Sequence, residues 1–511
     1  MKAEECKMGL LCQWLTGCSK SVGLITFILV TIFSNHVSTQ DDVVTFDQVL
    51  EAARNGSFLS VDATQQKEMA QLDYEIFKTR LKPSISLDGR VPGFFSSSSA
   101  ITQPNGTIEF QRISQNNASL SLFAQQNIPL TGARLFVQSD LQRFDDFTLN
   151  NRLYNGIPLR IGISQPLFGF NQIKWDSKLA PVYLNEAETQ YNFDLENTQF
   201  QATFLYFQVI IAEENSKIAL LNTEVNENLI KIAERRLELG KISEDEKLQL
   251  QIELENARTN LRTSNYNLQA AKNNLATFLY SSSTFGNSNN SIDISNYTFI
   301  IPEPLQEIMI DEDRAVRMAL KNRPEIIAYE RQILESQRNM AQVKAQTGPQ
   351  MSLFASFGLA RGSKNLEQIY ADPFTEQQLS LSFSIPIVDW GRRKSTRKQA
   401  EIQLQNTLAN ISQDKIEIEN NTKLKVREFL MLQQAVQDQE AIRAMADKRF
   451  EIANERYILG AISITDFTLA QREKDQTRRN YIQTLSNYWN AYYSLRLLTG
   501  FDFAKNEQIT Y

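Results

Sequence analysis

The residue types that most often carry catalysis or bind transition metals are confined to the start of the sequence. The chain has three cysteines, Cys6, Cys12 and Cys18, and a single histidine, His36. Without that segment the chain offers no thiol nucleophile, no disulfide, no histidine base and no cysteine or histidine metal ligand. Carboxylates are plentiful, but no phosphate-binding loop or metal-ligand spacing accompanies them. The sequence therefore indicates a protein that is not an enzyme and needs no cofactor or metal.

Two carboxylates, Glu246 and Asp466, are distinguished by a turn motif that occurs twice. Each follows a serine by three positions, and each serine follows a Leu-Gly pair. The two turns comprise Leu239, Gly240, Lys241, Ile242 and Ser243 in the first copy and Leu459, Gly460, Ala461, Ile462 and Ser463 in the second. Glycine favours the left-handed residue that ends a helix, and serine followed three residues later by an acid is typical of a capping box. We therefore expect a tight turn between two antiparallel helices in each copy, with helix capping as the plain role of both acids.

The elements that hold these turns are expected to be very long helices. Between about Asn171 and Leu239 the sequence has no glycine and only one proline, Pro181; between about Arg392 and Leu459 it has neither. Apolar residues recur every three or four positions in both stretches, which is typical of helices packed on helices. Each helix would extend about 100 Å. Helices of this length predict an elongated bundle or tube.

A second kind of segment alternates with period two. Leu379, Leu381 and Phe383 alternate with serines, and similar runs occur over about 83–168 and 349–388. One apolar and one small polar face predict strands between two different environments, as in a soluble sandwich or a membrane barrel. We expect four to six strands. An extra hairpin over 119–142 could join the sheet or cap it, and residues 94–107 look loop-like.

The paired turns and strands indicate an internal duplication. We expect a first repeat over 41–282 with its tip at 239–243, a linker with one short strand over 283–310, a second repeat over 311–500 with its tip at 459–463, and a tail over 501–511. One long helix would lie beside two shorter helices stacked end to end in each copy. We expect the helices over about 243–280 and 311–346 to form one such stack, and those over about 463–500 and 45–81 to form the other. Glu253 and Arg258 of the first repeat correspond to Glu473 and Arg478 of the second.

The first 40 residues are typical of an export signal. Lys2, Lys7 and Lys20 precede an apolar run over 22–33, which is too short to cross a hydrocarbon core of about 30 Å. We expect a cleaved signal peptide; a retained N-terminal anchor is the alternative, and Met8 is a second possible start. A small-residue stretch ending at Cys18 resembles a lipidation box, but it precedes the apolar run instead of following it.

Too few strands are available for one chain to close a barrel. Strands in lipid cannot leave their edges unpaired, so several chains would have to share one barrel. Three chains with four strands each would give twelve, and the helices would continue the wall as a tube. A formal net charge of -6 without a basic cluster argues against nucleic acid as a partner.

This arrangement resembles the TolC-like outer-membrane factors of tripartite efflux and type I secretion systems. The resemblance covers essentially the whole chain after the signal segment. It rests on the duplication, on Asn-Arg-Pro-Glu at 322–325, on Ser-Gln-Pro-Leu-Phe-Gly at 164–169 and Ser-Ile-Pro-Ile-Val-Asp-Trp-Gly at 384–391, and on the second turn. It implies an α+β chain that forms one third of a twelve-stranded outer-membrane barrel continued by a long α-helical periplasmic barrel. A periplasmic adaptor and an inner-membrane pump are the implied partners, besides two further copies and lipid.

The same resemblance assigns roles to residues at the turns. Asp466 matches an acid that rings the periplasmic entrance, Glu246 is its counterpart in the first copy, and Tyr457 matches a tyrosine of the gate. Both turns match the region that docks the adaptor. Capping alone remains the alternative for the acids, and plain helix packing for Tyr457. Two matching positions depart from the family, because a second acid is replaced by Leu469 and a gate arginine by Ile462.

An elongated periplasmic coiled-coil protein with a structural or adaptor role is the alternative function. It would explain the long helices and the missing catalytic residues. It would not explain strands with an apolar and a serine-rich face in each copy. The sequence favours a passive outer-membrane duct and does not indicate what passes through it.

Overall fold

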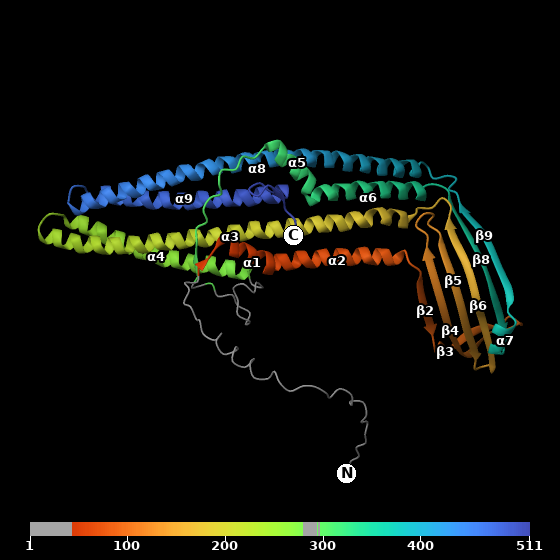
Figure 1. Ribbon diagram of the computed structural model, residues 1–511. Coiled ribbons are helices and arrows are strands. Elements are labelled where there is room, and N and C mark those ends of the chain that lie inside the picture. Colours follow the sequence, from red (N-terminus) through yellow and green to blue (C-terminus); the bar gives the residue numbers. More distant parts are fainter. Residues whose placement is uncertain (1–42, 280–293, 295–296) are drawn as a thin grey trace, which may run out of the picture.

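The computed structural model describes residues 43–279, 294 and 297–511. The expected signal segment over 1–40 and most of the polar part of the linker, 283–293 and 295–296, lie outside the described residues. The described chain is elongated: long helices run side by side, and a curved sheet stands at one end (Figure 1). Chains with long helices and a separate sheet have the α+β character expected from the alternating segments.

Two helices of 67 residues each, α3 (Gln172–Glu238) and α8 (Arg392–Ile458), run the length of the molecule. At 1.5 Å per residue each extends about 100 Å. Toward the tips, α4 (Glu244–Phe278) packs on α3 and α9 (Ile464–Thr499) packs on α8. Toward the sheet, α2 (Phe58–Arg80) packs on α3 and α6 (Pro324–Gln346) packs on α8. The stacks are therefore α4 with α2 and α9 with α6, and the expected pairing of 243–280 with 311–346 and of 463–500 with 45–81 is wrong. The apolar residues that recur every three or four positions thus form a stripe along each long helix. That stripe is buried against several neighbouring helices.

Both repeats contain a helix break that the sequence analysis did not predict. We expected one helix over about 45–81 and another over 311–346. The structure has α1 (Phe46–Gly56) before α2, and α5 (Glu312–Asn322) before α6. Ser57 and Arg323 separate these pairs and both have extended backbone. A residue before proline is driven out of the helical region, which explains the break at Arg323, and the Ser57 side chain caps α2 by accepting from Ser60 N.

A seven-stranded sheet follows the order β2-β4-β5-β6-β8-β9, with β3 paired to β4 beside β2. All neighbours are antiparallel. The strands are β2 (Ser84–Arg90), β3 (Phe94–Thr102), β4 (Ile108–Asn127), β5 (Arg134–Asp146), β6 (Asn151–Pro166), β8 (Gln350–Ser363) and β9 (Phe374–Ser384). A short helix, α7 (Leu366–Ala371), joins β8 to β9.

The sheet corrects one expectation and decides between two alternatives. Residues 94–107 are not a loop, because most of them form β3 and the turn into β4. The extra hairpin over 119–142 joins the sheet, since β4 and β5 are paired on both sides. One chain therefore supplies six adjacent strand positions, not the four used in the count of twelve.

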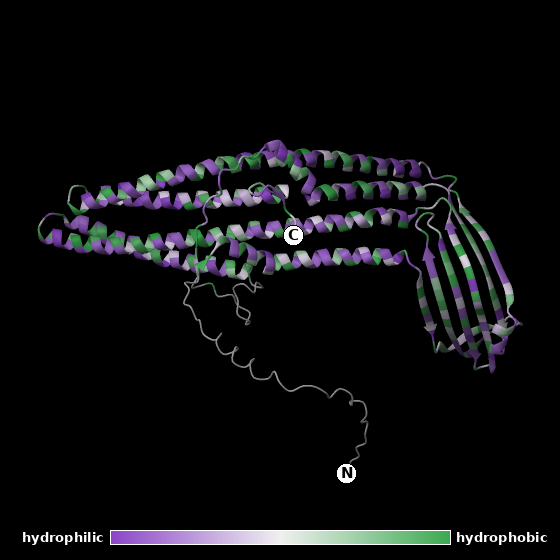
Figure 2. Cartoon of the chain, viewed as in Figure 1, coloured by the Kyte–Doolittle hydropathy of each residue, from purple (hydrophilic) through white to green (hydrophobic). Residues whose placement is uncertain are grey.

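The two faces of the sheet differ in chemistry along β2, β4, β5, β6 and β8. A row of directly paired residues on one face is apolar, and the next row along the strands, on the other face, is mostly polar. The first row is Ile85, Ala124, Val137, Ile161 and Phe357; the second is Ser86, Phe123, Gln138, Arg160 and Gly358. Figure 2 shows this alternation as bands along the strands. The large apolar side chains of the first row are exposed on this chain.

The apolar core lies midway along the helices. Tyr206, Phe207, Phe429, Tyr488 and Leu495 are fully or almost fully buried there. Two small sheets cover it: β1 (Val43–Val44) pairs with β7 (Thr298–Phe299), and β10 (Phe501–Asp502) pairs with β11 (Glu507–Gln508). The tail over 501–511 is thus part of the packed middle of the molecule.

Candidate functional site

The two helical tips have matching backbone geometry. Gly240 and Gly460 adopt φ values of 63° and 75°, the left-handed conformation that favours glycine. The amide of Lys241 donates to Arg236 O at 2.8 Å, and the amide of Ala461 donates to Arg456 O at 2.8 Å. These bonds define a Schellman motif at each helix end. The tight turns predicted at 239–243 and 459–463 are present.

Each tip helix begins with a serine cap, but the predicted capping boxes are incomplete. Ser243 Oγ accepts from Glu246 N at 3.2 Å, and Ser463 Oγ accepts from Asp466 N at 3.1 Å. In the part of the chain that the structure describes, neither acid reaches back to the amide of its serine; Asp466 instead accepts from Ser463 Oγ at 2.8 Å. The exposed Asp466 and the half-buried Glu246 keep carboxylate oxygens available to solvent or to a passing ion.

Tyr457 is buried between the tips, where Arg236 crosses from the first repeat to the second. The Arg236 guanidinium lies 5.2 Å from the centre of the Tyr457 ring and donates to the carbonyl oxygens of Tyr457 and Ile458 at 3.2 and 3.3 Å. The ring also contacts Phe467 at 5.1 Å. Burial raises the pKa of the Tyr457 hydroxyl, while the charge of Arg236 lowers it and that of Glu246 raises it. The structure therefore brings Tyr457, Glu246 and Arg236 together.

The sequence analysis did not predict the contact between Arg236 and the end of α8. The Arg236 guanidinium neutralises carbonyls at the C-terminal end of α8, where the helix dipole is negative. The duplication carried a signal for it, because Arg456 occupies the corresponding place before the second glycine. A basic residue repeated at the same distance from both tips would have marked the position.

The two departures from the family have different surroundings. Ile462 and its counterpart Ile242 pack against the small apolar cluster below the tips, which includes Leu229, Leu250 and Phe467. Leu469 is 56% exposed on this chain. Apolar packing thus occupies the place where the family would have an arginine, and Arg236 supplies a cation from the other repeat.

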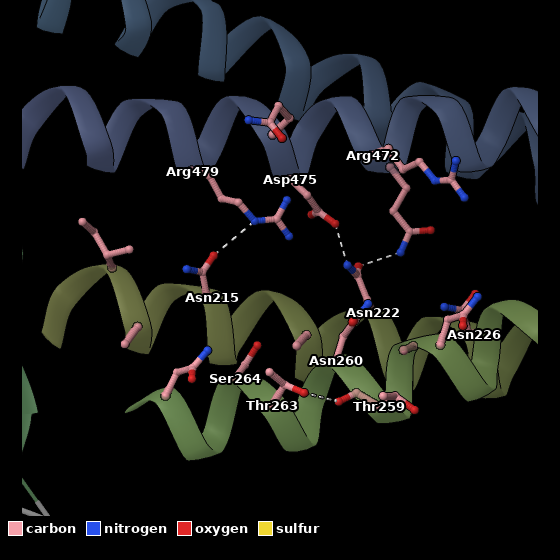
Figure 3. Close-up of a pocket in the computed structure, with 18 of the residues that line it drawn as sticks. Asn215, Asn222, Asn226, Thr259, Asn260, Thr263, Ser264, Arg472, Asp475 and Arg479 are labelled. Atoms are coloured by element: carbon pink, nitrogen blue, oxygen red, sulfur yellow. Dashed lines mark hydrogen bonds between the residues drawn. The ribbon is translucent and has the colours of Figure 1, made fainter. Parts of the chain in front are cut away.

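A polar groove of about 1020 Å³ lies between α3, α4 and α9, farther from the tips than the apolar cluster. Figure 3 shows asparagines of α3 on one wall, hydroxyl and amide side chains of α4 on another, and Arg472, Asp475 and Arg479 of α9 facing them. Asn222 bridges the walls, since its Nδ2 donates to Asp475 at 2.5 Å and its Oδ1 accepts from Gln471 at 2.6 Å. The lining is mostly polar, and its described residues offer no nucleophile paired with a base.

Among the described residues that line this groove, Asp475 is the one acid that is buried and has no cationic side chain bonded to it. It is 5% exposed, and it accepts a hydrogen bond from the neutral amide of Asn222. Burial raises the pKa of its carboxyl group, and the Asn222 hydrogen bond and the nearby charges of Lys474, Arg478 and Arg479 lower it less. Sequence spacing gave no signal for this residue, because its burial depends on the packing of α9 against α3.

Residues 43–279, 294 and 297–511 contain no group of three or more acidic, cysteine or histidine side chains that could hold a metal ion. Among the helices within these ranges, none combines the length and apolar character needed to cross a membrane.

Comparison with known families identifies part of the chain. Residues 315–501, which include the second tip, match the family described as "Outer membrane efflux protein". This segment, which is less than half of the chain, is similar to that family. The family resemblance drawn from the duplicated motifs is thereby confirmed. A search of curated proteins found no match.

Solved structures share the fold of the described chain beyond this segment. The Campylobacter jejuni CmeC outer membrane channel has a TM-score of 0.63 at 16% identity, covering 91% of this chain and 86% of that one. The Neisseria gonorrhoeae MtrE outer membrane channel, in an open state, gives 0.59 at 14%, covering 89% and 88%. The Vibrio cholerae outer membrane protein VceC gives 0.59 at 14%, covering 89% and 95%. At these identities the likeness shows a common fold, and the expected combination of sheet and long helices is confirmed.

Proposed function

We propose that three copies of this chain form a passive exit duct through the outer membrane for a tripartite efflux or type I secretion system. The sheets of the copies close one barrel in the outer membrane, and the helices continue it as a tube in the periplasm. The helical tips form the entrance, where an adaptor and an inner-membrane pump deliver the cargo. The similarity of residues 315–501 to the outer membrane efflux protein family and the fold shared with outer membrane channels support this function.

The observation that carries the proposal is the apolar face of the sheet. Ile85, Leu122, Val137, Ile161 and Leu381 lie on five different strands, point to one face, and are each 40% to 73% exposed. Leu381 is 52% exposed between Ser380 and Ser382 on the other face. Soluble proteins rarely expose so broad an apolar patch, whereas a barrel in lipid needs one outside and a polar face inside.

The tips are the proposed entrance. Glu246 and Asp466 would favour cations there, since a threefold ring of carboxylates concentrates positive charge. Tyr457 and Arg236 would hold the two repeats of one chain together in the closed state. The backbone of both turns, 239–243 and 459–463, would dock the adaptor.

Fractionation and planar-bilayer recording test the duct. We expect the full-length protein in the outer membrane as a trimer that dissociates on heating, and we expect the purified trimer to conduct ions. A water-soluble periplasmic monomer that leaves bilayers silent would contradict the proposal and would favour a structural coiled-coil role. Co-purification of an adaptor and a pump would test the assembly.

A further inference from the structure

The sheet of one chain is larger than a twelve-stranded barrel requires. We propose that each chain contributes six strand positions, so that three chains close a barrel of eighteen strands, three times six, and β9 of one copy pairs with β2 of the next. This inference rests on the proposed duct and fixes the width of its membrane part. The partner at both sheet edges is a second copy of this chain.

The first step is that β2 and β3 occupy a single strand position. Both pair with β4, β2 with its Ser119–Gln125 part and β3 with its Ile108–Asn116 part. Gly93 bridges the interruption: its amide donates to Asn116 Oδ1 at 2.9 Å, and its carbonyl accepts from Asn117 N at 3.0 Å. A Cβ at Gly93 would lie 2.0 Å from Asn117 O, so glycine is required for this close approach. The outer part of the β3–β4 hairpin continues past the end of β5, which stops opposite Gln115.

The second step is that β4 and β5 belong to the wall and do not cap it. β4 has continuous pairing to β5, and β5 has continuous pairing to β6 apart from one bulge between Gln138 and Asp140. Leu135 and Val137 of β5 lie directly beside Ile163 and Ile161 of β6 on the apolar face. The two β5 residues, Leu135 and Val137, are each 40% exposed. A cap over the pore would have no reason to carry this face in register with the neighbouring strands.

The third step concerns the two free edges of the sheet. β2 runs away from the helices and β9 runs toward them, so the two edges of adjacent copies would pair antiparallel (Figure 1). Both edges alternate in the same way, with Ile85 and Leu87 outward on β2 and Leu381 and Phe383 outward on β9. An unpaired edge in lipid costs several kcal/mol per unsatisfied group, and a second copy satisfies both edges at once.

The register of the sheet gives the tilt that closure needs. The direct pairs lead from Ser84 of β2 through the intervening strands to Gln378 of β9; the intermediate partners are Gln125, Phe136, Gly162 and Ser356. β9 continues from there to Ser384, at the helical end where β2 begins. The offset is about one residue per strand. With a rise of about 3.3 Å and a strand spacing of about 4.8 Å, this corresponds to a tilt of about 35°, within the range of membrane barrels.

The consequence is a wider exit than the family resemblance implies. At a strand spacing of about 4.8 Å and a tilt of about 40°, eighteen strands enclose a backbone diameter of about 36 Å and twelve enclose about 24 Å. Barrels of 16–18 strands leave an aqueous channel. The membrane part would therefore admit folded or bulky solutes that a twelve-stranded wall would stop.

Cross-linking tests the edge pairing. In a background with Cys6, Cys12 and Cys18 changed to serine, Ser86→Cys is combined in turn with Ser380→Cys, Ser382→Cys or Ser384→Cys, all on the polar face. We expect one of the three pairs to link neighbouring copies of the trimer under mild oxidation. The control pair Ser86→Cys with Leu381→Cys places the thiols on opposite faces and should not link.

Lipid contact tests whether β5 lies in the wall. Val137→Cys and the adjacent Gln138→Cys, each labelled with a small fluorophore, serve as a matched pair in liposomes with brominated lipid. We expect quenching at least several-fold stronger at 137 than at 138. Equal quenching at the two positions would overturn the six-strand wall, because a capping hairpin has no lipid face.

Counting strands by electron cryomicroscopy of the detergent-purified trimer separates the two proposals. Eighteen strands support the inference, and twelve strands with β4 and β5 outside the wall overturn it while leaving the duct intact. A protein that forms no trimer and conducts no ions would defeat the duct itself.

Discussion

Arg496 and Glu196 form a two-bond ion pair that ties the last helix to the middle of the first long helix. Arg496 Nη2 lies 2.8 Å from Glu196 Oε1, and Nε lies 3.1 Å from Oε2. Arg496 Nη1 also bonds Asp502 Oδ2 at 2.9 Å, and the three side chains are 11%, 2% and 4% exposed. The Tyr511 hydroxyl donates a further hydrogen bond to Glu196. The C-terminal residues are thus held in the packed middle by a buried charge cluster.

Removing the arginine should be among the most destabilising single changes in the helical part. Arg496→Met leaves two buried carboxylates without their cation, which costs about 3–5 kcal/mol. We expect a much lower denaturant midpoint, measured by tryptophan fluorescence of the detergent-purified protein. Arg427→Met is the matched control, since it breaks an ion pair to Glu312 in which the arginine is 64% exposed; that change should cost less than about 1 kcal/mol. Equal effects would contradict the role of burial.

The long helices, the tips and the alternating strands were predictable because each depends on local pattern. Helix length follows from the scarcity of glycine and proline, and the tip geometry follows from Gly240, Gly460 and the two serines. The similarity of residues 315–501 to the outer membrane efflux protein family, together with the shared fold, confirms the resemblance that those repeated motifs carried. The proline after Arg323 indicated a helix break in the sequence. We missed it because the apolar spacing continues across that position and suggested one uninterrupted helix.

What escaped prediction depends on contacts between distant segments. Glu196 and Arg496 are 300 positions apart, and nothing near either one marks it as a partner of the other. β3 was missed because its serines and its following turn look like a loop, whereas pairing with β4 makes it a strand. Arg236 was visible only by comparing the two copies, and Asp475 only through the packing of α9 on α3.

Neutralising the buried acid of the groove should stabilise the fold at neutral pH. Burial raises the pKa of Asp475 in the folded state, so the folded protein holds this proton more tightly than the unfolded chain. Ionisation of Asp475 therefore lowers the free energy of unfolding. This loss grows as the pH rises from the unfolded pKa of about 3.9 through the folded pKa. We expect Asp475→Asn to raise the melting temperature at pH 7 and to change it little at acidic pH, below about 4.

The control for that change is Asp466→Asn, an exposed acid in the first turn of the same helix. Melting curves of both variants across pH separate burial from simple loss of negative charge. A stabilisation by Asp475→Asn that is the same at every pH would contradict the explanation.

Gly162 should tolerate no side chain. The Phe136 ring covers it, and a Cβ there would lie 2.4 Å from Phe136 Cζ and 2.9 Å from Ala355 O. Phe136 stacks between Phe123 and Phe354 with ring centres about 6 Å apart, at 6.0 and 5.9 Å, so it cannot move without breaking this row. We expect Gly162→Val to abolish the heat-resistant trimer on gels, with a cost of about 1–3 kcal/mol or more from overpacking. Gly362→Ala is the control, since the nearest atom to its Cβ is 3.9 Å away, and it should assemble normally.

Loosening the contact between the tips should open the entrance. Arg236→Gln removes the guanidinium that lies over Tyr457 and bonds two carbonyls at the end of α8. Such charge-assisted bonds contribute about 1.5–3 kcal/mol, so the closed tips should separate more often. We expect an open probability raised by about tenfold or more in planar bilayers without adaptor or pump. The neighbouring Arg235→Gln changes an exposed arginine of the same helix turn and should leave gating unchanged; if both variants gate alike, general loss of charge is the cause.

The two tip acids are the last element of the entrance, and their test separates ion attraction from capping. Asp466→Asn and Glu246→Gln keep side-chain size and leave the serine caps in place, because Ser463 and Ser243 accept the backbone amides of these residues. A carboxylate ring in the pore favours cations, so the double variant should lose a measurable part of its cation preference in salt-gradient reversal potentials. Glu244→Gln removes an acid from the same first turn and is the charge control. If the reversal potential of the double variant equals that of the unaltered channel while Ser463→Ala costs about 1 kcal/mol of stability, the tip residues serve the helix ends alone.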